Sequence, residues 1–581
     1  MSNTSNTVGM VRASVALIME RPHAQVLVIG GGINGIATFR DLALQGIEVI
    51  LVERDDYGSG ASAASSHMIH GGIRYLENGE FRLVRESVQE RNGLLRIAPH
   101  YVKPLETTIP IFSTFSGILA APLRFLTHKQ GKPKERGAAL IKIGLTAYDW
   151  FSRDGGAVPR HRFLGRKKSL AELPDFDHNL HYTATYYDAS VHEPERLALD
   201  VLKDGLATGD HARSANYIGA IGVSDGGIRV KDAVTGSEFV ITADVVVNAS
   251  GPWTDLTNAS LGLESAFMGG TKGSHIVLKN QRLLDALKGR ELFFENNDGR
   301  IVLIYPLKGC VLVGTTDLEA DIHETAVCTE EEVDYFFDLV KQVLPNIHVD
   351  RSHVVFRYSG IRPLPRHEDT QPGFVSRDYR IVRGTIAKLP DTKLLSLVGG
   401  KWTTFRALSE HLANEALGFL GIARTTSTVG LAIGGGKGFP TTPEARARWV
   451  DTNSRGIDHD TVERLLERYG TRATEVIDFL VDRAAVPLTS DPEFTTAEIA
   501  YFAVHEQVVH LIDVVIRRTN IAFVGGVTVE LLDELAGLLA GPLGWSADDR
   551  RAEVADTVER LRSLYGVELS PAPLQPSTTV E

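Results

Sequence analysis

The sequence has little cysteine, no long hydrophobic run and no excess of positive charge, and each absence excludes a class of protein. Two cysteines, Cys310 and Cys328, occur among 581 residues, too few for a disulfide framework, which favours a reducing compartment. No uninterrupted apolar stretch reaches the roughly eighteen residues of a membrane-spanning helix. The formal net charge of −12 argues against a general nucleic-acid-binding protein, which is usually basic. We therefore expect a cytoplasmic protein that neither spans the membrane nor binds nucleic acid.

The length and composition indicate a multidomain globular protein. A chain of 581 residues exceeds one ordinary hydrophobic core, so two or three domains are expected. Hydrophobic residues make up 43% and charged residues 23%, which is typical of soluble proteins. The N-terminal residues 1–23 contain an apolar run only from Ala13 to Met19, and we expect them to form a flexible leader. We expect residues 571–581 to form a flexible tail.

The first motif with chemical meaning lies between two short apolar runs. QVLVIG (25–30) predicts a strand, and the following GGGINGIATFRDLALQG predicts a tight turn and a helix. Gly30, Gly32 and Gly35 give the pattern G-x-G-x-x-G, in which the missing side chains let the backbone approach a pyrophosphate at the helix N-terminus. The sequence therefore predicts a dinucleotide site at this turn.

An acidic residue follows at the spacing that such a site requires. The second predicted strand, IEVILVE, ends at Glu53, where an acid can bind a ribose 2′-hydroxyl. Glu53 favours NAD or FAD, whereas the adjacent Arg54 leaves a phosphorylated ribose open. The pattern does not choose between these cofactors, and a plain strand-turn-helix unit is the structural alternative.

The stretch SSHMIHGGIRYLENGEFRLV (65–84) resembles the FAD-dependent glycerol-3-phosphate dehydrogenases of the glycine oxidase and D-amino acid oxidase superfamily. The resemblance continues in order through YYDASVHEPERL (186–197), VVVNASGPW (245–253), KGSHIV (272–277), VGTTDLE (313–319), YSGIRPL (358–364), SRDY (376–379) and GGKWTTFR (399–406). It implies FAD as cofactor and an α/β fold. The parts implied are a Rossmann-like FAD-binding domain of the glutathione-reductase type, an antiparallel-sheet substrate domain and a C-terminal helical domain.

One position departs from the family pattern. The family usually reads S-S-K-L-I-H, whereas this chain has His67 in place of the lysine. A lysine near the cofactor would be permanently charged, while a histidine need not be charged at pH 7. Any electrostatic role of that lysine is therefore in doubt here.

The glycine pattern and the resemblance together predict the residues that contact FAD. Hydroxyls and imidazoles can hydrogen-bond the cofactor, and glycines let the chain pass close to it. The predicted FAD contacts are Gly30, Gly32, Ile33, Asn34, Gly35, Glu53, Arg54, Ser65, Ser66, His67, His70, Gly71, Gly72, Ser250, Gly251, Gly400, Lys401, Trp402 and Thr403.

A phosphorylated substrate needs cations of fixed geometry. Arg74, Arg362 and Lys401 stand in glycine- or proline-containing turns of the family motifs, where they are less exposed than cations on a solvated helix face. Arginine supplies a planar fork and lysine a compact charge. We expect these three residues to bind the substrate, together with Tyr75.

Oxidation of a secondary alcohol also needs a base. His275 in KGSHIV is the predicted base, because imidazole titrates near neutral pH. Arg362 is expected to orient the substrate and stabilise developing negative charge, since arginine is a poor proton acceptor. The resemblance implies oxidation of sn-glycerol 3-phosphate to dihydroxyacetone phosphate, with hydride transfer to N5 of FAD and electrons passed to a membrane quinone.

Two other functions stay open at this point. An oxidase of the same fold would use oxygen as acceptor and act on glycerol 3-phosphate or on an amino acid, because carboxylate and phosphate both accept a bidentate arginine. A flavin-binding module without turnover is the second alternative.

Two further motifs fail on inspection, and no metal site is predicted. In HEQVVH (505–510) the histidines are five residues apart, whereas one helical face requires four. GGGKG (434–438) lacks the Ser or Thr that follows the lysine of a phosphate-binding loop. We interpret the latter as an interdomain linker.

The positions of the motifs predict discontinuous domains. The FAD-binding domain is assigned to 24–103, 181–267 and 351–420 and the substrate domain to 104–180 and 268–350. A linker (421–440) and a helical domain (441–570) complete this assignment.

The stretch 115–150 sets apolar runs around Lys129, Lys132, Lys134 and Arg136. Apolar segments that flank cations favour binding to an anionic lipid surface, although a solvated loop between buried helices can have the same sequence pattern. We therefore expect peripheral attachment to the inner face of the cell membrane, and a homodimer is left open.

Overall fold

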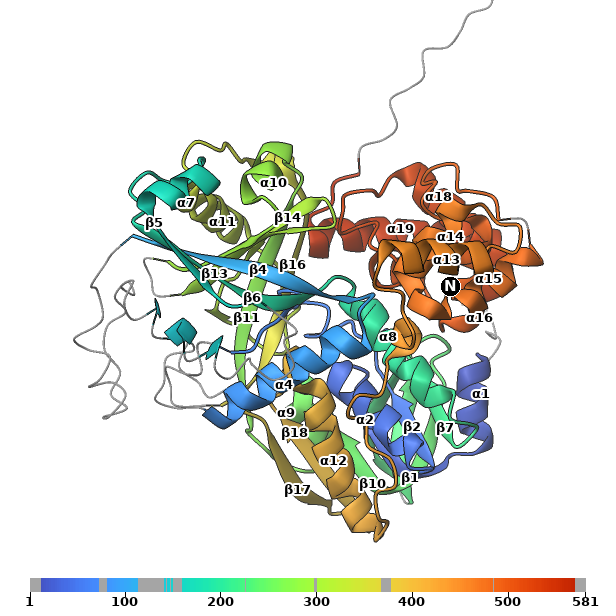
Figure 1. The fold of residues 1–581 in the computed structure, drawn as a ribbon. Coiled ribbons are helices and arrows are strands. Elements are labelled where there is room, and N and C mark those ends of the chain that lie inside the picture. Colours follow the sequence, from blue (N-terminus) through green and yellow to red (C-terminus); the bar gives the residue numbers. More distant parts are fainter. Residues whose placement is uncertain are drawn as a thin grey trace, which may run out of the picture.

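A computed structural model shows three structural parts: a mainly parallel sheet with helices, a mainly antiparallel sheet, and a group of C-terminal helices (Figure 1). It describes residues 12–72, 81–112, 141–142, 144–146, 148–149, 159–224, 226–296, 300–366, 378–483 and 485–569.

The first sheet has the strand order β17-β18-β10-β1-β2-β7, with β8 and β9 forming a hairpin against β10. Its parallel members are β1 (His23–Ile29), β2 (Val49–Val52), β7 (Ala212–Ala215), β10 (Glu238–Asn248) and β18 (Leu389–Val398). The others are β8 (Ile218–Ser224), β9 (Gly227–Asp232) and β17 (Arg380–Ile386). The runs of Val, Ile and Leu in β1 and β2 are buried, as parallel strands covered on both faces require.

Three helices and one short N-terminal helix cover this sheet. They are α2 (Ile33–Leu44), α8 (Pro194–Leu206), α12 (Phe405–Leu420) and α1 (Ala13–Glu20). In α1, Val15 and Ile18 are fully buried, and the preceding Arg12 forms an ion pair with Asp232. The prediction of a flexible leader is therefore wrong for this segment, because its apolar side packs against β7. Residues 1–11 lie outside the described residues.

The second sheet has the order β15-β11-β14-β13-β12-β4-β6-β3, with β16 beside β11 and β5 beside β6. Its strands are β3 (Met68–Ile69), β4 (Val102–Ile111), β5 (Arg162–Gly165), β6 (Tyr182–Val191), β11 (Met268–Leu278), β12 (Glu291–Glu295), β13 (Ile301–Leu307), β14 (Cys310–Gly314), β15 (Leu318–Glu319) and β16 (Val354–Pro365). All pairs are antiparallel except β12 with β4. Helices α7 (Arg166–Glu172), α10 (Gln281–Leu287) and α11 (Glu330–Val343) pack beside it.

Three strands lie in a different sheet from the one predicted. The sequence assignment places β3, β6 and β16 in the FAD-binding domain, but β3 pairs with β6, β6 pairs with β4, and β16 pairs along its length with β11. Pairing between distant strands, which no local pattern reports, decides sheet membership. Helix α4 (Phe81–Ile97) runs along the boundary between the two sheets (Figure 1).

The C-terminal region consists of helices whose starts are well defined. They are α13 (Pro443–Asn453), α14 (His459–Tyr469), α15 (Ala473–Val481), α16 (Thr496–His505), α17 (Leu511–Asp513), the π-helical turn η7 (Val514–Arg518), α18 (Val529–Leu543) and α19 (Ala547–Tyr565). Side chains such as Asp458, Thr528 and Ser546 cap them by accepting backbone N–H groups.

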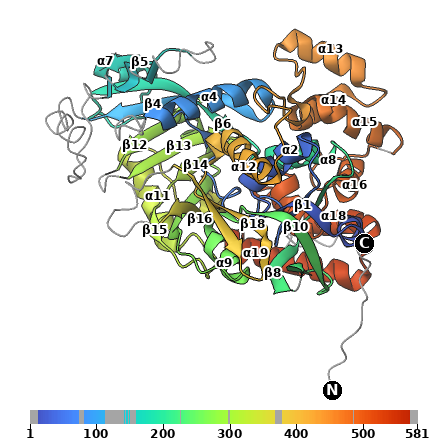
Figure 2. The same cartoon turned by 90° about the horizontal axis from the view of Figure 1, so that it is seen from below.

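These helices share one hydrophobic cluster with the second sheet, including Phe356 and Leu303. They also contact α8, which lies beside them in Figure 2. They therefore form an integral layer against both sheets.

The predicted linker contains a closely packed segment. A Cβ at Gly434 would lie 2.0 Å from Asp200 Oδ2, and one at Gly435 would lie 2.0 Å from the Tyr469 carbonyl oxygen. GGGKG therefore lies between α8 and the C-terminal helices and is no loose connection.

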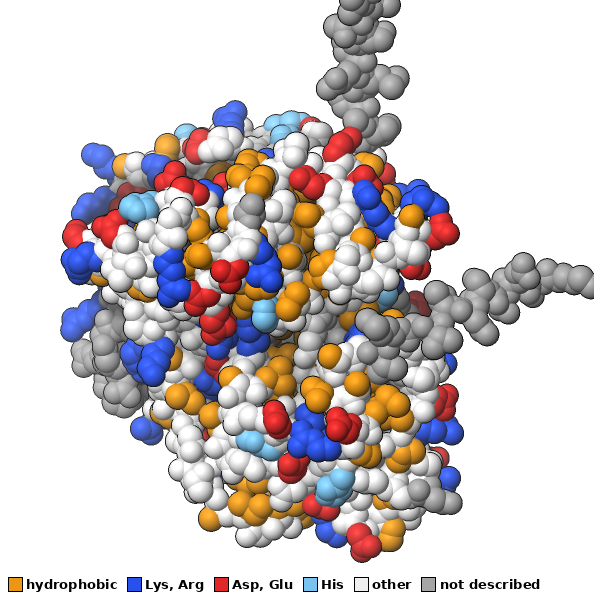
Figure 3. Space-filling view, turned by 90° about the vertical axis from the view of Figure 1, so that its right-hand side faces the viewer, with side chains coloured by type: hydrophobic (Ala, Val, Ile, Leu, Met, Phe, Trp, Pro, Cys, Tyr) orange, Lys and Arg blue, Asp and Glu red, His pale blue; other side chains and the backbone are white. Residues whose placement is uncertain are grey.

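The surface gives no evidence of a spanning segment. None of the helices among the described residues combines the length and apolarity needed to cross a bilayer. On the face shown in Figure 3, hydrophobic side chains and charges of both signs are interspersed. The basic stretch 115–150 lies almost wholly outside the described residues, so lipid binding there stays a prediction.

Candidate active site

The glycine turn joins β1 to α2 and excludes side chains. A Cβ at Gly30, whose φ is +113°, would lie 2.6 Å from the Ala249 carbonyl oxygen, and one at Gly35 would lie 1.9 Å from the Gly30 oxygen. The N–H of Ile33, in the first turn of α2, donates to Ser62 Oγ at 3.0 Å. The turn thus brings a helix N-terminus, with its partial positive charge, against the end of β10.

Glu53 closes one side of this turn. Its carboxylate accepts the N–H of Gly31 at 2.6 Å and the N–H of Asp55 at 2.9 Å. Burial raises the pKa of Glu53. Arg54 lies over the ring of Trp253 at 4.3 Å and pairs with Asp55. Glu53 therefore stands at the end of β2 beside the glycines, as its predicted role with ribose requires.

The other predicted FAD motifs converge on the same edge of the first sheet. Gly400, with φ +111°, approaches Asn34 so closely that a Cβ would lie 2.6 Å from Asn34 Nδ2. Trp402 donates from Nε1 to the Ser62 carbonyl at 2.9 Å, and its neighbour Thr403 is buried.

At the end of β10, Ser250 donates to Asn248 Oδ1 at 2.6 Å, and Gly251 adopts a φ of +62°. Segments near residues 30, 62, 250 and 400 are therefore neighbours in space. These segments meet at the carboxyl ends of the parallel strands, which is where a Rossmann-like fold binds its cofactor.

The second sheet holds the backbone of the loop that contains Ser65 and Ser66. The hydroxyl of Tyr358 donates to the Ser65 carbonyl at 2.8 Å, and that of Tyr305 donates to the Ser66 carbonyl at 2.9 Å. Ser66 Oγ lies 2.8 Å from His275 Nε2. The loop is thus fixed between the glycine turn and the predicted base.

His67 is buried on the side of this loop that faces the C-terminal helices. Its φ is +53°, its Nδ1 lies 3.1 Å from the Val191 carbonyl, and its ring lies 5.4 Å from that of Phe523. Because the carbonyl can only accept, Nδ1 carries the proton. Burial lowers the pKa of His67 to about 3, so it is neutral at pH 7.

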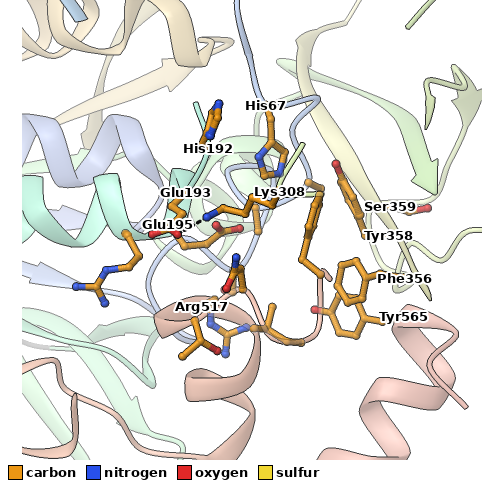
Figure 4. Close-up of a pocket in the computed structure, with 18 residues that line it drawn as sticks. His67, His192, Glu193, Glu195, Lys308, Phe356, Tyr358, Ser359, Arg517 and Tyr565 are labelled. Atoms are coloured by element: carbon orange, nitrogen blue, oxygen red, sulfur yellow. Dashed lines mark hydrogen bonds and ion pairs between the residues drawn. The ribbon is translucent and has the colours of Figure 1, made fainter. Parts of the chain in front are cut away.

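A cavity of about 70 Å³ lies next to His67, between the start of α8, β16 and the C-terminal helices (Figure 4). Lys308 forms an ion pair with Glu193 there, and burial raises the pKa of Glu195 to about 7. The predicted contact of His67 with FAD stays a prediction.

Asp188 fixes the backbone at Gly71 by a hydrogen bond, and the sequence did not reveal this contact. Its Oδ1 accepts the Gly71 N–H, Arg91 Nη1 and the Tyr148 hydroxyl, each at 2.8 Å. A Cβ at Gly71 would lie 2.0 Å from the Tyr148 oxygen, and Gly72 has a φ of +80°. Asp188 lies within the quoted motif YYDASVHEPERL, but its role depends on a contact 117 residues away.

Helix α4 connects this network to the GGKWTTFR motif. Lys401 Nζ donates to Ser87 Oγ at 3.1 Å, and Arg406 forms an ion pair with Glu90 at 2.7 Å. Arg91, on the same helix, is the fully buried partner of Asp188. Predicted substrate residues Arg74 and Tyr75 lie outside the described residues. His70 lies within them, at the end of β3.

Arg362 is held in one orientation by three consecutive residues of VGTTDLE. Its Nη2 donates to Thr315 Oγ1 at 3.0 Å and to the Thr316 carbonyl at 2.7 Å, while Nη1 lies 2.6 Å from Asp317 Oδ1. The absence of a side chain at Gly273 makes this room, since a Cβ there would lie 2.3 Å from Arg362 Nη2. Asp317 is a residue that the sequence analysis missed.

His275 lies on β11 with its ring stacked on Tyr358 at 4.9 Å and 15°. A Cβ at Gly314, its partner on β14, would lie 2.1 Å from the imidazole. Burial, followed by the positive charge of Arg362, lowers the pKa of His275 well below its usual value. His275 is therefore neutral at pH 7.

Comparison with known proteins shows which family this chain belongs to. The sequence profile described as FAD dependent oxidoreductase matches residues 25–389, and that of the C-terminal domain of alpha-glycerophosphate oxidase matches residues 391–550. A glycerol-3-phosphate dehydrogenase from Synechocystis sp. is 32% identical over 86% of this chain and 89% of its own length. The chain belongs to the FAD-dependent glycerol-3-phosphate dehydrogenase family.

Other relatives agree with this family. The mitochondrial glycerol-3-phosphate dehydrogenase of Mus musculus is 28% identical over 94% of this chain and 74% of its own length. The structure of a glycerol-3-phosphate dehydrogenase from Bacillus halodurans, solved with FAD, superposes with a TM-score of 0.72 at 22% identity, covering 94% of this chain and 97% of that chain. The predicted family, fold class and FAD cofactor are confirmed.

The residues of this chain fit the family's cofactor. At Gly30, Gly35 and Gly400 a Cβ would collide with neighbouring protein atoms, so the backbone at this turn carries no side chains, and α2 begins beside it. These are the features that a pyrophosphate and a closely approaching ring require.

Proposed function

We propose that this protein oxidises sn-glycerol 3-phosphate to dihydroxyacetone phosphate with FAD as hydride acceptor, and that the electrons then pass to a membrane quinone. The observation that carries the proposal is a neutral His275 on β11 beside the Ser65–Ser66 loop, with a firmly held Arg362 on the neighbouring strand β16. When bound, FAD supplies the acceptor for the hydride at its N5.

The chain's own residues supply the base and the cations. His275 accepts the proton of the substrate hydroxyl, because its ring is neutral. Arg362 places its positive charge beside the substrate and stabilises negative charge as the proton leaves. Arg74, Tyr75 and Lys401 complete the proposed substrate contacts, and Thr315 to Asp317 orient Arg362.

The electron acceptor and the location follow from the same proposal. A quinone lies in the membrane, so the protein would work as a peripheral protein on the inner face of the cell membrane. The cations and apolar runs of 115–150 support this placement. Release of the protein from membranes by high salt with mild detergent is the expected behaviour, and full recovery in the soluble fraction at low salt would contradict it.

Anaerobic addition of glycerol 3-phosphate tests the reaction. The flavin absorbance should bleach, and a quinone analogue should restore it faster than oxygen does. Bleaching by an amino acid instead would support an oxidase-type substrate. No bleaching by any of these would support a flavin-binding module without turnover.

Arg362→Lys tests the substrate contact. Lysine retains the charge but loses the fork, so we expect KM to rise roughly 10- to 100-fold, as for the loss of a charged hydrogen bond of about 1.5–3 kcal/mol. The bound FAD should remain, as judged by its absorbance. Unchanged KM would exclude Arg362 from substrate binding.

A further inference from the structure

The junction between the glycine turn and the C-terminal helices contains a buried cluster of charges. Asp56 is fully buried, three residues after Glu53. It accepts Arg517 Nε at 2.5 Å, Arg518 Nη1 at 2.6 Å and Arg518 Nη2 at 3.0 Å. Asp513 balances the second cation, because its Oδ1 accepts Arg517 Nη2 at 2.6 Å. Two acids and two arginines are thus paired in the interior.

Polar contacts from the first sheet complete the cluster. Asn216 donates from Nδ2 to Asp56 Oδ1 at 2.8 Å and to the Gln507 carbonyl at 2.9 Å. The hydroxyl of Tyr217 donates to Asp513 Oδ1 at 2.7 Å. The rejected metalloprotease pattern HEQVVH lies here, and Gln507 from it accepts the Tyr57 hydroxyl at 3.0 Å.

The same loop touches the glycine turn directly. The N–H of Gly58 donates to the Gly31 carbonyl at 2.9 Å. A Cβ at Gly31 would lie 2.9 Å from the ring of Tyr57. Residues 55–58 therefore have the FAD turn on one side and Arg517 with Arg518 on the other.

Apolar packing alone does not determine this junction. The cavity of about 70 Å³ lined by Arg517 (Figure 4) also has Ser59, Ala63 and Ala64 in its wall, so the segment that follows residues 55–58 is not closely packed against the C-terminal helices there. Removing one partner of a buried ion pair leaves an uncompensated charge and is strongly destabilising. The arginines also lie in η7, a π-helical turn, a conformation that often occurs at functional sites.

We propose that the C-terminal helices hold residues 55–58 in the conformation that binds FAD, through the Asp56–Arg517–Arg518 cluster, so that FAD affinity is coupled to the order of this junction. Arg517 and Arg518 are positioning residues, since they act on the cofactor through Asp56 and Tyr57. The proposal rests on the placement of FAD at the glycine turn. Coupling between two sites is reciprocal, so each should report on the other.

Hydrogen exchange of the full chain tests the reciprocal effect. The protein is depleted of FAD, then reloaded, and exchange is compared for peptides covering Val514–Arg518 and Ala473–Val481. FAD should slow exchange in the first peptide and leave the second, which lies away from the cluster, nearly unchanged. Equal exchange of the first peptide in both states would overturn the proposal.

FAD affinity of matched variants tests the direct effect. Arg518→Leu should raise the Kd for FAD, measured by flavin fluorescence, by at least about fivefold, the lower end of typical coupling. Arg472→Leu is the control. Arg472 also links the C-terminal region to the first sheet's helices, because it forms ion pairs with Asp200 and Asp204. Both acids belong to α8 and not to residues 55–58. The Kd of this control should stay within about twofold of wild type.

A third variant separates affinity from folding. If Arg518→Leu does not fold, Arg518→Lys keeps the charge and loses the fork, and it should still raise the Kd for FAD above that of Arg472→Leu. Equal Kd values for the two variants would overturn the proposal. Failure of glycerol 3-phosphate to bleach the flavin would refute the proposed function alone, because neither FAD affinity nor exchange depends on the substrate.

Discussion

At the residue scale, burial determines the charge of two histidines at the candidate active site. His67 follows Ser66 in the loop and His275 lies 2.8 Å from Ser66 Oγ, and burial lowers the pKa of both. Desolvation penalises the charged imidazolium, so both rings are neutral at pH 7. Only His275 stands beside Arg362, which explains why one neutral imidazole is proposed as a base and the other is a buried structural contact of the loop.

The acid stability of the protein should depend on His67. Its pKa is about 3 in the folded chain and 6.5 in the reference state. Between these values the unfolded chain binds one more proton, so stability falls by up to about 1.4 kcal/mol for each pH unit as the pH drops from 6.5 toward 3. His67→Asn, which tolerates the positive φ, should reduce this slope in urea unfolding.

His323, which is exposed, gives the control for this measurement. His323→Asn should leave the slope of the free energy of unfolding against pH much closer to that of wild type than His67→Asn does. Identical slopes for His67→Asn and wild type would show that His67 is not buried in its neutral form.

At the element scale, the turn between β1 and α2 depends on glycines, which have no side chains. Gly35 faces the Gly30 carbonyl at a distance that excludes any Cβ. The Ser62 hydroxyl and Glu53 then fix the N–H groups of the turn. A short local pattern therefore encodes the element, while its contacts come from two later segments.

Gly35→Ala should disrupt the FAD site. The new Cβ would meet the Gly30 oxygen at 1.9 Å, which forces the turn open, and we expect FAD affinity to fall at least tenfold, or about 1.4 kcal/mol. Gly418→Ala, at an uncrowded position of α12, is the control. It should retain FAD and gain up to about 1 kcal/mol of stability. Normal flavin content in purified Gly35→Ala protein would refute the placement of FAD at this turn.

At the scale of the whole molecule, the three parts are joined by shared cores and buried charges. The C-terminal helices share a hydrophobic cluster with β13, β14 and β16. Arg196 of α8 pairs with Glu506 at 2.9 Å, both buried. Such interfaces resemble the interior of one domain more than a contact between independent domains.

We therefore expect the parts to unfold together. Thermal unfolding followed by tryptophan fluorescence and by far-UV circular dichroism should give coincident transitions, because loss of the C-terminal helices exposes the core under the second sheet. Excess FAD at about 100 times its Kd should stabilise the whole chain by about 2.7 kcal/mol. Two separate transitions, with FAD shifting only one, would show that the C-terminal helices fold independently.

The sequence by itself determined the family, the cofactor and the strand-turn-helix unit that opens the fold. Glycines, apolar runs and the terminal acid act within about thirty residues, so their pattern is readable locally. The sequence also predicted His275 as the base and Arg362 as a substrate-binding residue, because these functions follow from residue type. Both roles stay proposals.

Only the tertiary structure decided which strands share a sheet and which charges are paired. It placed β3, β6 and β16 in the second sheet and showed that part of the predicted leader is a packed helix. It also revealed the partners Asp188, Asp317 and Arg518, whose roles arise from contacts with residues distant in sequence or from burial. A lone acid or arginine in a sequence looks like surface charge, and only burial beside an opposite charge makes it a structural determinant.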